Sequence, residues 1–187
     1  MRRSSAILGL VNEIIIRRVA PADSPLLRRV RLLALATDLA SFGSTYEREA
    51  AFSDDVWAER AQHNSRGDDA STLIAICGDA PVGMITGARD EARPDVFHVF
   101  GTWVAPAARR DNVGRTLLHE IEEWAISCGG TSMQLSVTDT AAAAQQLYAR
   151  AGYAPNGGSV ESVHTPGLRE TSLTKYVGAP ASRPAER

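Results

Sequence analysis

The sequence predicts a single α/β (α+β) domain in which helices flank a mixed β-sheet. Short β-branched and aromatic runs alternate with segments whose apolar residues recur every three or four positions, as in amphipathic helices. The 187 residues, 44% of them hydrophobic, are enough for one sizeable core and few for two. We expect this domain to span residues 13–177, with disordered tails over 1–12 and 178–187.

The first predicted elements are a strand and a long helix. Ile14–Ile16 is a β-branched run, and Ser24 followed by Pro25 is a favourable N-cap and first-turn pair. The helix is expected to bury Leu26, Leu27, Val30, Leu33, Ala34 and Thr37 and to expose Arg28, Arg29 and Arg31.

A loop, a second helix and a hairpin follow. Residues 40–47 break the helical periodicity, which predicts a loop. Ser53, with two acidic residues in the first turn after it, starts a shorter helix that ends near Gln62. The apolar run Thr72–Cys77 and the β pattern of Val82–Thr86 are joined by turn-forming residues, which predicts a hairpin.

The second half of the chain predicts strand, helix, strand, helix and strand. Val96–Val104 leads into a helix that closes at the glycine pair 129–130. Met133–Val137 is the next strand and Thr171–Val177 the last, with a second helix and a loop over Pro155–Gly167 between them. The apolar faces of the two helices are Val113, Leu117, Leu118, Ile121, Trp124 and Ala125 in the first, and Ala144, Leu147, Tyr148 and Ala151 in the second.

The pattern centres on residues 103–124, where a strand, a turn and a helix follow one another. The first N–H groups of a helix have no intrahelical partner and the helix dipole is positive there, so a phosphate group is favoured at that end. Gly114 has no Cβ to hold a ligand away from the backbone. The basic side chains around it are Arg109, Arg110 and Arg115. We interpret the turn as an anion-binding site; an ordinary strand-to-helix turn with a solvated basic patch is the alternative.

The segment VAPAARRDNVGRTLL resembles the acyl-CoA-binding motif of the GNAT superfamily of N-acyltransferases, R/Q-x-x-G-x-G/A after a strand that ends in valine. In this resemblance Val104 is the strand valine, Arg109 the R/Q and Gly114 the last glycine. Asn112 stands in place of the middle glycine and is the non-glycine residue that best tolerates a left-handed conformation. The implied cofactor is acetyl-CoA, and the candidate residues that bind it are Trp103, Val104, Ala105, Arg109, Arg110, Asp111, Asn112, Val113, Gly114, Arg115 and Thr116.

A second stretch, AAAAQQLYARAGY, is similar to the N-x-x-A-x-x-L-Y-x-x-x-G-F/Y pattern near the GNAT C-terminus. Tyr148 matches the tyrosine of that pattern, and Ala141 stands where the family often has asparagine. The run RLLALATDLASFGSTYERE also resembles bacterial members that carry an R-L-x-A-L and F-G-S-T-Y-E run. Together with the order of the predicted elements, these matches imply the GNAT fold over roughly residues 13–177.

The resemblance implies acetyl transfer from a thioester to an amine, which needs a route for the amine proton and an acid for the leaving thiolate. Tyr148 matches the family's usual general acid, and packing beside the helix is its alternative role. His98 occupies a strand position where many members have glutamate, so it is our candidate base; a structural, half-buried histidine is the equal alternative. We expect His98 to share a strand face with Phe100, Thr102 and Val104.

The acceptor is expected to be a small-molecule or peptide amine. The loop after the first helix supplies the candidate acceptor-binding residues Phe42, Tyr46 and Glu47, of which Glu47 is also a weaker candidate for the base. A homodimer is left open. Because Asn112, Ala141 and His98 depart from common family choices, a non-catalytic acyl-CoA-binding sensor or a degenerate partner subunit is the alternative function.

Composition argues against several other classes. The net charge is −2 and the pI about 6.1, so no global basic field indicates nucleic acid or an anionic membrane as a partner. The four histidines are scattered without metal-ligand spacing, and we expect no metal site. Cys77 and Cys128 make no disulfide framework, which fits a reducing cytoplasm. The apolar patch near the N-terminus is too short for a targeting signal.

Overall fold

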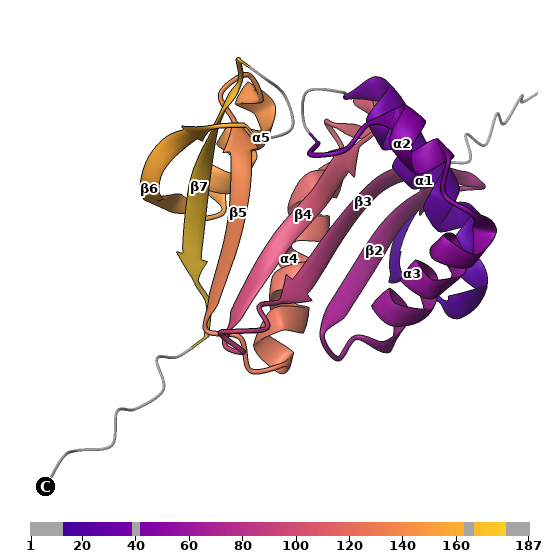
Figure 1. The fold of residues 1–187 in the computed structure, drawn as a ribbon, viewed down its shortest axis with the longest axis horizontal. Helices are drawn as coiled ribbons and strands as arrows, with labels where there is room; N and C mark the ends of the chain where they lie inside the picture. The colour runs from indigo at the N-terminus through magenta and orange to yellow at the C-terminus, as the bar shows by residue number, and fades with distance from the viewer. Residues whose placement is uncertain (1–12, 39–41, 163–166, 179–187) are drawn as a thin grey trace, which may run out of the picture.

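Figure 1 shows the computed structural model, which describes residues 13–38, 42–162 and 167–178. The strands are β1 (Ile14–Arg18), β2 (Ala70–Cys77), β3 (Ala80–Arg89), β4 (Val96–Val104), β5 (Ser132–Thr138), β6 (Ala154–Glu161) and β7 (Arg169–Tyr176). The helices are α1 (Ser24–Thr37), α2 (Tyr46–Ala50), α3 (Asp54–Arg66), α4 (Val113–Ser127) and α5 (Ala142–Arg150), with 3-10 turns at Pro21–Asp23 and Pro106–Ala108. The predicted mixed α/β fold is confirmed.

The described strands form one sheet in the order β1-β2-β3-β4-β5-β7-β6. Neighbouring strands are antiparallel except β4 and β5, which are parallel. Those two strands pair only at Val96 with Ser132, Phe97 with Met133 and His98 with Gln134. Beyond these pairs the two strands diverge, and the gap between them is visible in Figure 1.

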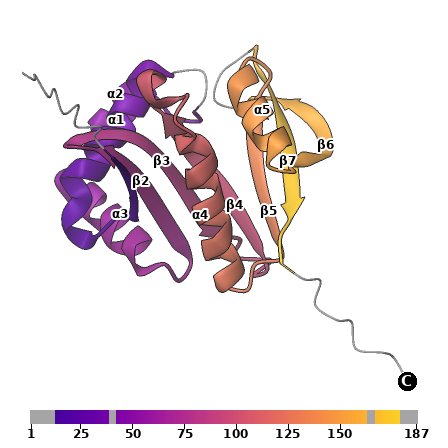
Figure 2. The ribbon, with the colours of Figure 1, turned by 180° about the vertical axis from the view of Figure 1, so that it is seen from behind.

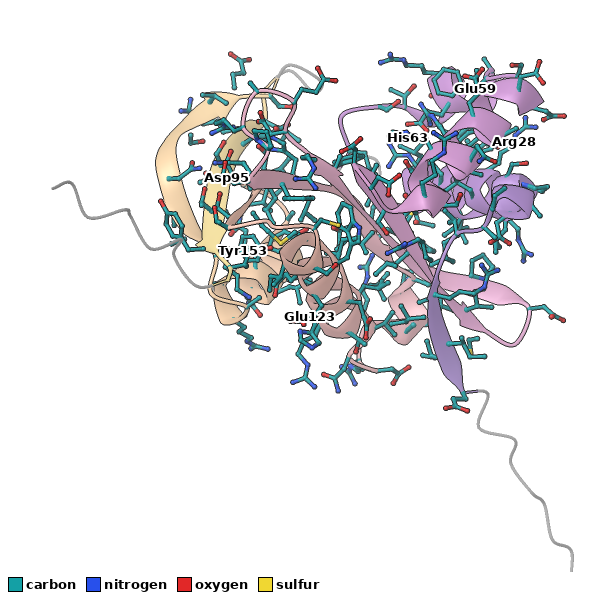
Figure 3. The ribbon with its side chains drawn as sticks, turned by 90° about the horizontal axis from the view of Figure 1, so that it is seen from below. Arg28, Glu59, His63, Asp95, Glu123 and Tyr153 are labelled. Carbon is teal, nitrogen blue, oxygen red and sulfur yellow. The ribbon has the colours of Figure 1, made fainter. Side chains whose placement is uncertain are left out.

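Helices cover both faces of the sheet. Figure 2 shows α4 crossing one face, whereas α1 and α3 lie on the other. Figure 3 shows the same division from below, with Tyr153 and Glu123 on the α4 side and Arg28 and Glu59 on the other. All six residues of the predicted α4 face are buried and belong to one core, while α1 and α3 pack around a second core that contains Trp57 and Trp103. These two cores hold the middle strands rigidly between helices.

A β-bulge changes the direction of side chains along β4. Gly101 has a φ of 66°, and the pairing with β3 shifts between Phe100 and Trp103. Before the bulge Val99 packs into the α4 core, whereas Trp103, four residues later, packs into the α1 core. The expectation that His98 and Val104 share one face is therefore wrong, because the extra residue reverses the alternation between them.

Two stretches expected to be loops are partly regular. Residues 46–50 form the short helix α2, whose N-cap Thr45 accepts a hydrogen bond from the Arg48 N–H at 3.3 Å. Part of the loop predicted over Pro155–Gly167 is the edge strand β6, where proline is tolerated because no further strand needs its missing N–H. Two strands, not one, therefore follow α5.

Helix α1 also differs in detail from its prediction. Leu35 is buried while Leu33 is exposed, so the apolar face is rotated slightly from the predicted one. Arg31 was expected on the solvated side, yet its side chain is only 15% exposed and contacts the buried Glu49. The tails 1–12 and 179–187 lie outside the described residues. Within the described ranges, every helix is too short or too polar to cross a lipid bilayer.

Candidate active site

A cleft of about 1550 Å³ occupies the place where β4 and β5 diverge. Its walls come from α1, from residues 42–44, from β4 and β5, from the start of α4, from most of α5, and from a few residues of β6 and β7. The cleft brings together many of the predicted site residues, namely Phe42, His98, Trp103, Val104, Arg109, Asn112, Gly114, Arg115 and Tyr148.

The N-terminus of α4 points at this cleft without a side-chain cap. Asn112 has φ 59° and ψ 10°, and it is the one non-glycine residue with positive φ in the described part of the chain. The expected left-handed conformation is thus confirmed. Among residues 13–38, 42–162 and 167–178, no side chain accepts a hydrogen bond from the first turn of α4, so its leading N–H groups are open to an anionic ligand. Gly114 lies in this turn and lines the cleft.

The three arginines of the motif differ in what they contact. Arg109 donates to Asp38 Oδ2 at 2.5 Å and to the Val104 carbonyl at 3.1 Å, so its charge is turned towards the end of α1. Arg110 and Arg115 are exposed, and Arg115 lines the cleft beside the first turn of α4. Arg115 is therefore better placed than Arg109 to add charge at this helix end.

Some predicted cofactor residues present only backbone towards a ligand. Trp103 is buried, and its indole N–H donates to Thr37 Oγ1 at 2.9 Å. Val113 is also buried in the α4 core. Asp111 and Thr116 are exposed but lie outside the lining of the cleft, as does Ala105. The buried Trp103 and Val113 side chains anchor the strand-turn-helix in the two cores and so position the groups that line the cleft.

Tyr148 lies on α5, and its side chain lines the cleft between the diverging strands. The residue is 6% exposed and its ring lies 5.8 Å from the ring of Tyr153 in a T-shaped arrangement. Burial raises the pKa of the Tyr148 hydroxyl, and the Thr102 side chain on β4 partly opposes that rise. The hydroxyl is therefore protonated at neutral pH and can act as a proton donor, but not as a base.

His98 lies at the closed end of the gap and has a carboxylate partner. Its Nε2 lies 2.8 Å from Asp90 Oδ2, and its side chain is 41% exposed. Asp90 also accepts a hydrogen bond from Arg93 at 2.8 Å. The hydrogen bonds from Arg93 and His98 hold the pKa of Asp90 well below its ordinary value. An ionised Asp90 favours a proton on Nε2, which leaves Nδ1 as the acceptor of the neutral ring.

The model of the Acetyltransferase (GNAT) family matches residues 34–153 of the sequence. This chain belongs to the GNAT acetyltransferase family. The matched region runs from α1 to Tyr153 and so contains the motif turn, His98 and Tyr148. No curated protein matches this sequence.

Solved structures of GNAT proteins share this fold. An acetyltransferase of the GNAT family from Streptococcus pneumoniae has a TM-score of 0.78 at 20% identity, covering 89% of this chain and 100% of its own. The yncA protein from Salmonella typhimurium, with its cofactor acetyl-CoA, has a TM-score of 0.75 at 16% identity and covers 92% and 99%. The PaiA N-acetyltransferase from Thermoplasma acidophilum, in complex with coenzyme A, has a TM-score of 0.68 at 17% identity and covers 88% and 99%.

The predicted acceptor residues of this GNAT protein are separated by the fold. Phe42 is buried at the edge of the cleft, beneath the guanidinium of Arg31 at 4.8 Å from the ring centre. Tyr46 and Glu47 are exposed on α2 and do not line the cleft. Of the three candidates, only Phe42 is within the cavity.

Sequence reasoning missed two residues that line the GNAT cleft, Thr102 and Arg31, and one that contacts a lining residue, Asp90. Thr102 lines the cleft, and its buried Oγ1 lies beside the Tyr148 hydroxyl. Asp90 lies in the polar loop after β3, and no spacing in the sequence predicts its contact with His98. Arg31 begins the R-L-x-A-L run, and that motif could have marked it as a functional residue. The helical pattern instead placed it on the solvated side of α1.

The residues present fit an acyl-CoA. The uncapped first turn of α4 suits a pyrophosphate, and the diverging strands leave β4 backbone beside the cleft for an extended amide-containing arm. A Cβ on Gly114 would lie at an ordinary van der Waals separation, 3.4 Å, from the side chains of Val104 and Leu147, and the glycine itself lines the cleft. The described part of the chain holds no cluster of three or more His, Cys, Asp or Glu residues suited to a metal ion.

Proposed function

We propose that this protein transfers an acetyl group from acetyl-CoA to a primary amine. The observation that carries the proposal is the early end of β4–β5 pairing at His98 and Gln134. The resulting cleft is lined by the α4 N-terminus at one part and by the Tyr148 side chain at another. A site for an anion and a buried proton donor therefore share one cavity.

The donor is supported by the family and by the similar structures that contain acetyl-CoA or coenzyme A. Acetyl-CoA supplies an acetyl thioester that a neutral amine can attack. The first-turn N–H groups of α4, with Arg115 and Arg110 nearby, would bind the pyrophosphate. The backbone of β4 next to Val104 would hold the pantetheine arm and so place the thioester towards Thr102.

Tyr148 is the proposed general acid. Its raised pKa keeps the hydroxyl protonated, and its position opposite Thr102 is in the diverging part of the strands. A proton donated to the departing sulfur would avoid release of a bare thiolate. Packing against Tyr153 fixes the ring, which favours one direction for the hydroxyl.

His98 is the proposed base, acting directly or through water. The Asp90 carboxylate orients the ring by its contact with Nε2. The equal alternative, a structural histidine that anchors the β3–β4 loop through Asp90, is consistent with the same contact. The kinetics of His98→Ala distinguish the two roles. The other parts of the proposal are a cytoplasmic location and a small-molecule or peptide acceptor.

Thiol release from acetyl-CoA in the presence of an amine panel tests this function. The panel should include amino acids, polyamines, peptides with open N-termini, lysine peptides and aminoglycosides, with mass spectrometry of the acetylated product. We expect turnover with at least one class. Tight acetyl-CoA binding with no acetylated amine from any class would favour the sensor alternative.

A further inference from the structure

Arg31 is a largely buried cation that lines the cleft and that the proposed chemistry does not use. Its side chain is 15% exposed, and Glu49, its partner, is 3% exposed. Arg31 Nε lies 3.1 Å from both carboxylate oxygens of Glu49, and its Nη2 donates to Oε1 at 2.7 Å. Arg60 Nη1 donates to Glu49 Oε2 at 3.1 Å from the other side. Glu49 therefore fixes one edge of the Arg31 guanidinium.

The other edge of Arg31 faces the bulge of β4. The guanidinium lies over the ring of Phe42, and a Cβ placed on Gly101 would be 3.8 Å from Arg31 Nη1. Nη1 makes no hydrogen bond to any residue that the structure describes. A guanidinium carries five N–H donors in a rigid fork, so this arrangement leaves the two Nη1 donors directed to the cleft side of the pair.

The charges of this cluster do not balance. One buried carboxylate meets two guanidinium groups, which leaves one excess positive charge. The Arg60 side chain is 41% exposed, so water solvates it, whereas Arg31 is mostly removed from water. The Nη1 atom of Arg31 is not among the buried side-chain atoms that lack a partner, so it is accessible from the cleft, and an anion there would add charge-assisted hydrogen bonds to it. The ion pair between Arg31 and Glu49 connects α1 to α2. It does not account for the Nη1 group of Arg31, which has no hydrogen-bond partner among the described residues.

Arg31 and the Tyr148 hydroxyl lie beside neighbouring residues of β4, which limits the size of a ligand that contacts both. Gly101 and Thr102 are consecutive, so their Cα atoms are about 3.8 Å apart. Thr102 is the β4 residue beside the Tyr148 hydroxyl. A compact molecule can therefore place an anionic group on Arg31 and an amine near Tyr148. An amino acid, which separates its carboxylate from its amine by one carbon, has this form.

We infer that Arg31 binds the carboxylate of the acceptor, and that the acceptor is a small amino acid. This inference rests on the proposed acetyltransferase function and adds the class of its substrate. Phe42 would pack against the same molecule and hold the guanidinium plane in place. Arg31 is a specificity residue here, since it contacts the acceptor away from the reacting atoms.

The test compares L-amino acids with their own carboxamides as acceptors, at saturating acetyl-CoA. For the amino acids used best, we expect kcat/KM at least tenfold higher than for the amide, mainly through KM. Arg31→Gln should remove that preference. Arg28→Gln is the matched control, because Arg28 also lies on α1 but pairs with Asp54 on the outer side and does not line the cleft.

A second variant guards against misfolding. Arg31→Met with Glu49→Leu removes both charges and leaves no unpaired carboxylate in the core, so it should fold and also lose the preference. Equal use of amides, or an unchanged preference in both Arg31 variants, would overturn the inference while acetyl transfer stands. Turnover of polyamines or peptide amides alone would overturn it in the same way. No turnover of any amine would refute the proposed function and the inference together.

Discussion

His98 of β4 pairs with Gln134 of β5, and no later residue of β4 pairs with β5. Each strand beyond this point has another partner, since β4 continues along β3 and β5 continues along β7. The sheet therefore opens between two strands that are each held from the outside. The cleft therefore results from the divergence of the strands and needs no mobile lid. Thr102 lines it on the β4 side, and Tyr148 of α5 lines it beside β5.

The α4 N-terminus is tested by substitutions at Gly114. Gly114→Glu should abolish acetyl-CoA binding in calorimetry, because a side chain and a negative charge would enter the anion site together. Gly114→Gln has the same size without the charge and should bind more tightly than the glutamate variant. In both variants the new Cβ makes ordinary contacts with Val104 and Leu147, so folding should persist. Wild-type affinity in a folded Gly114→Glu protein would rule out this site.

The base is tested by His98→Ala. We expect kcat to fall about 10²-fold, at the lower end of the range for general acid–base catalysis, with acetyl-CoA affinity nearly unchanged. His119→Ala, on the exposed side of α4, is the control and should keep wild-type rates. Full activity of His98→Ala from pH 6 to 9 would assign the proton to water or to another residue and leave His98 a structural role.

The buried Glu49 makes stability depend on pH. Burial raises the pKa of Glu49, but the hydrogen bonds and charge of Arg31, together with hydrogen bonds from Ser44 and Arg60, outweigh burial, so the net pKa is lowered. A lowered pKa contributes stability above the unfolded value of about 4.3, and that contribution is lost as the pH falls through the folded value. Glu49→Gln should therefore cost about 3 kcal/mol of unfolding free energy at pH 7, and the cost should shrink below pH 4.

Urea unfolding of wild type and Glu49→Gln at pH 7, 5 and 3.5 measures this difference. Arg28→Gln, which removes an exposed pair, should change the unfolding free energy by less than about 1 kcal/mol at each pH. A constant difference between wild type and Glu49→Gln across the three pH values would show that the carboxylate charge does not stabilise the fold.

Local patterns in the sequence predicted the parts of the site that depend on local geometry. The 3.6-residue period located the buried face of α4, and the tolerance of asparagine for positive φ explained Asn112 in place of glycine. Both features are determined within a few residues of chain. The buried face of α4 and the conformation of Asn112 could therefore be predicted without knowing which residues pack against them.

Features that depend on distant partners were not predictable in this way. The bulge at Gly101 is a mismatch in length between β4 and β3, so neither strand reveals it alone. Arg31 looked solvated because its carboxylate partner lies 18 residues away on a helix that was not predicted. Asp90 likewise becomes a partner of His98 only when the loop after β3 folds back. Tertiary packing decided each case.

The central claim is that Tyr148 donates a proton to the departing thiolate in the gap between β4 and β5. Tyr148→Phe keeps the ring, its packing and its contact with Tyr153, and removes only the hydroxyl. Tyr153→Phe is the matched control, since the Tyr153 hydroxyl contacts Met133 Sδ at 3.8 Å and does not line the cleft.

The decisive measurement is kcat of these two variants with the best amine acceptor, alongside acetyl-CoA affinity and melting temperature. We predict that Tyr148→Phe loses about 10²-fold in kcat with acetyl-CoA binding and melting temperature close to wild type, while Tyr153→Phe keeps its rate. Normal turnover by Tyr148→Phe would contradict the claim, and a melting temperature several degrees lower would assign the hydroxyl a structural role.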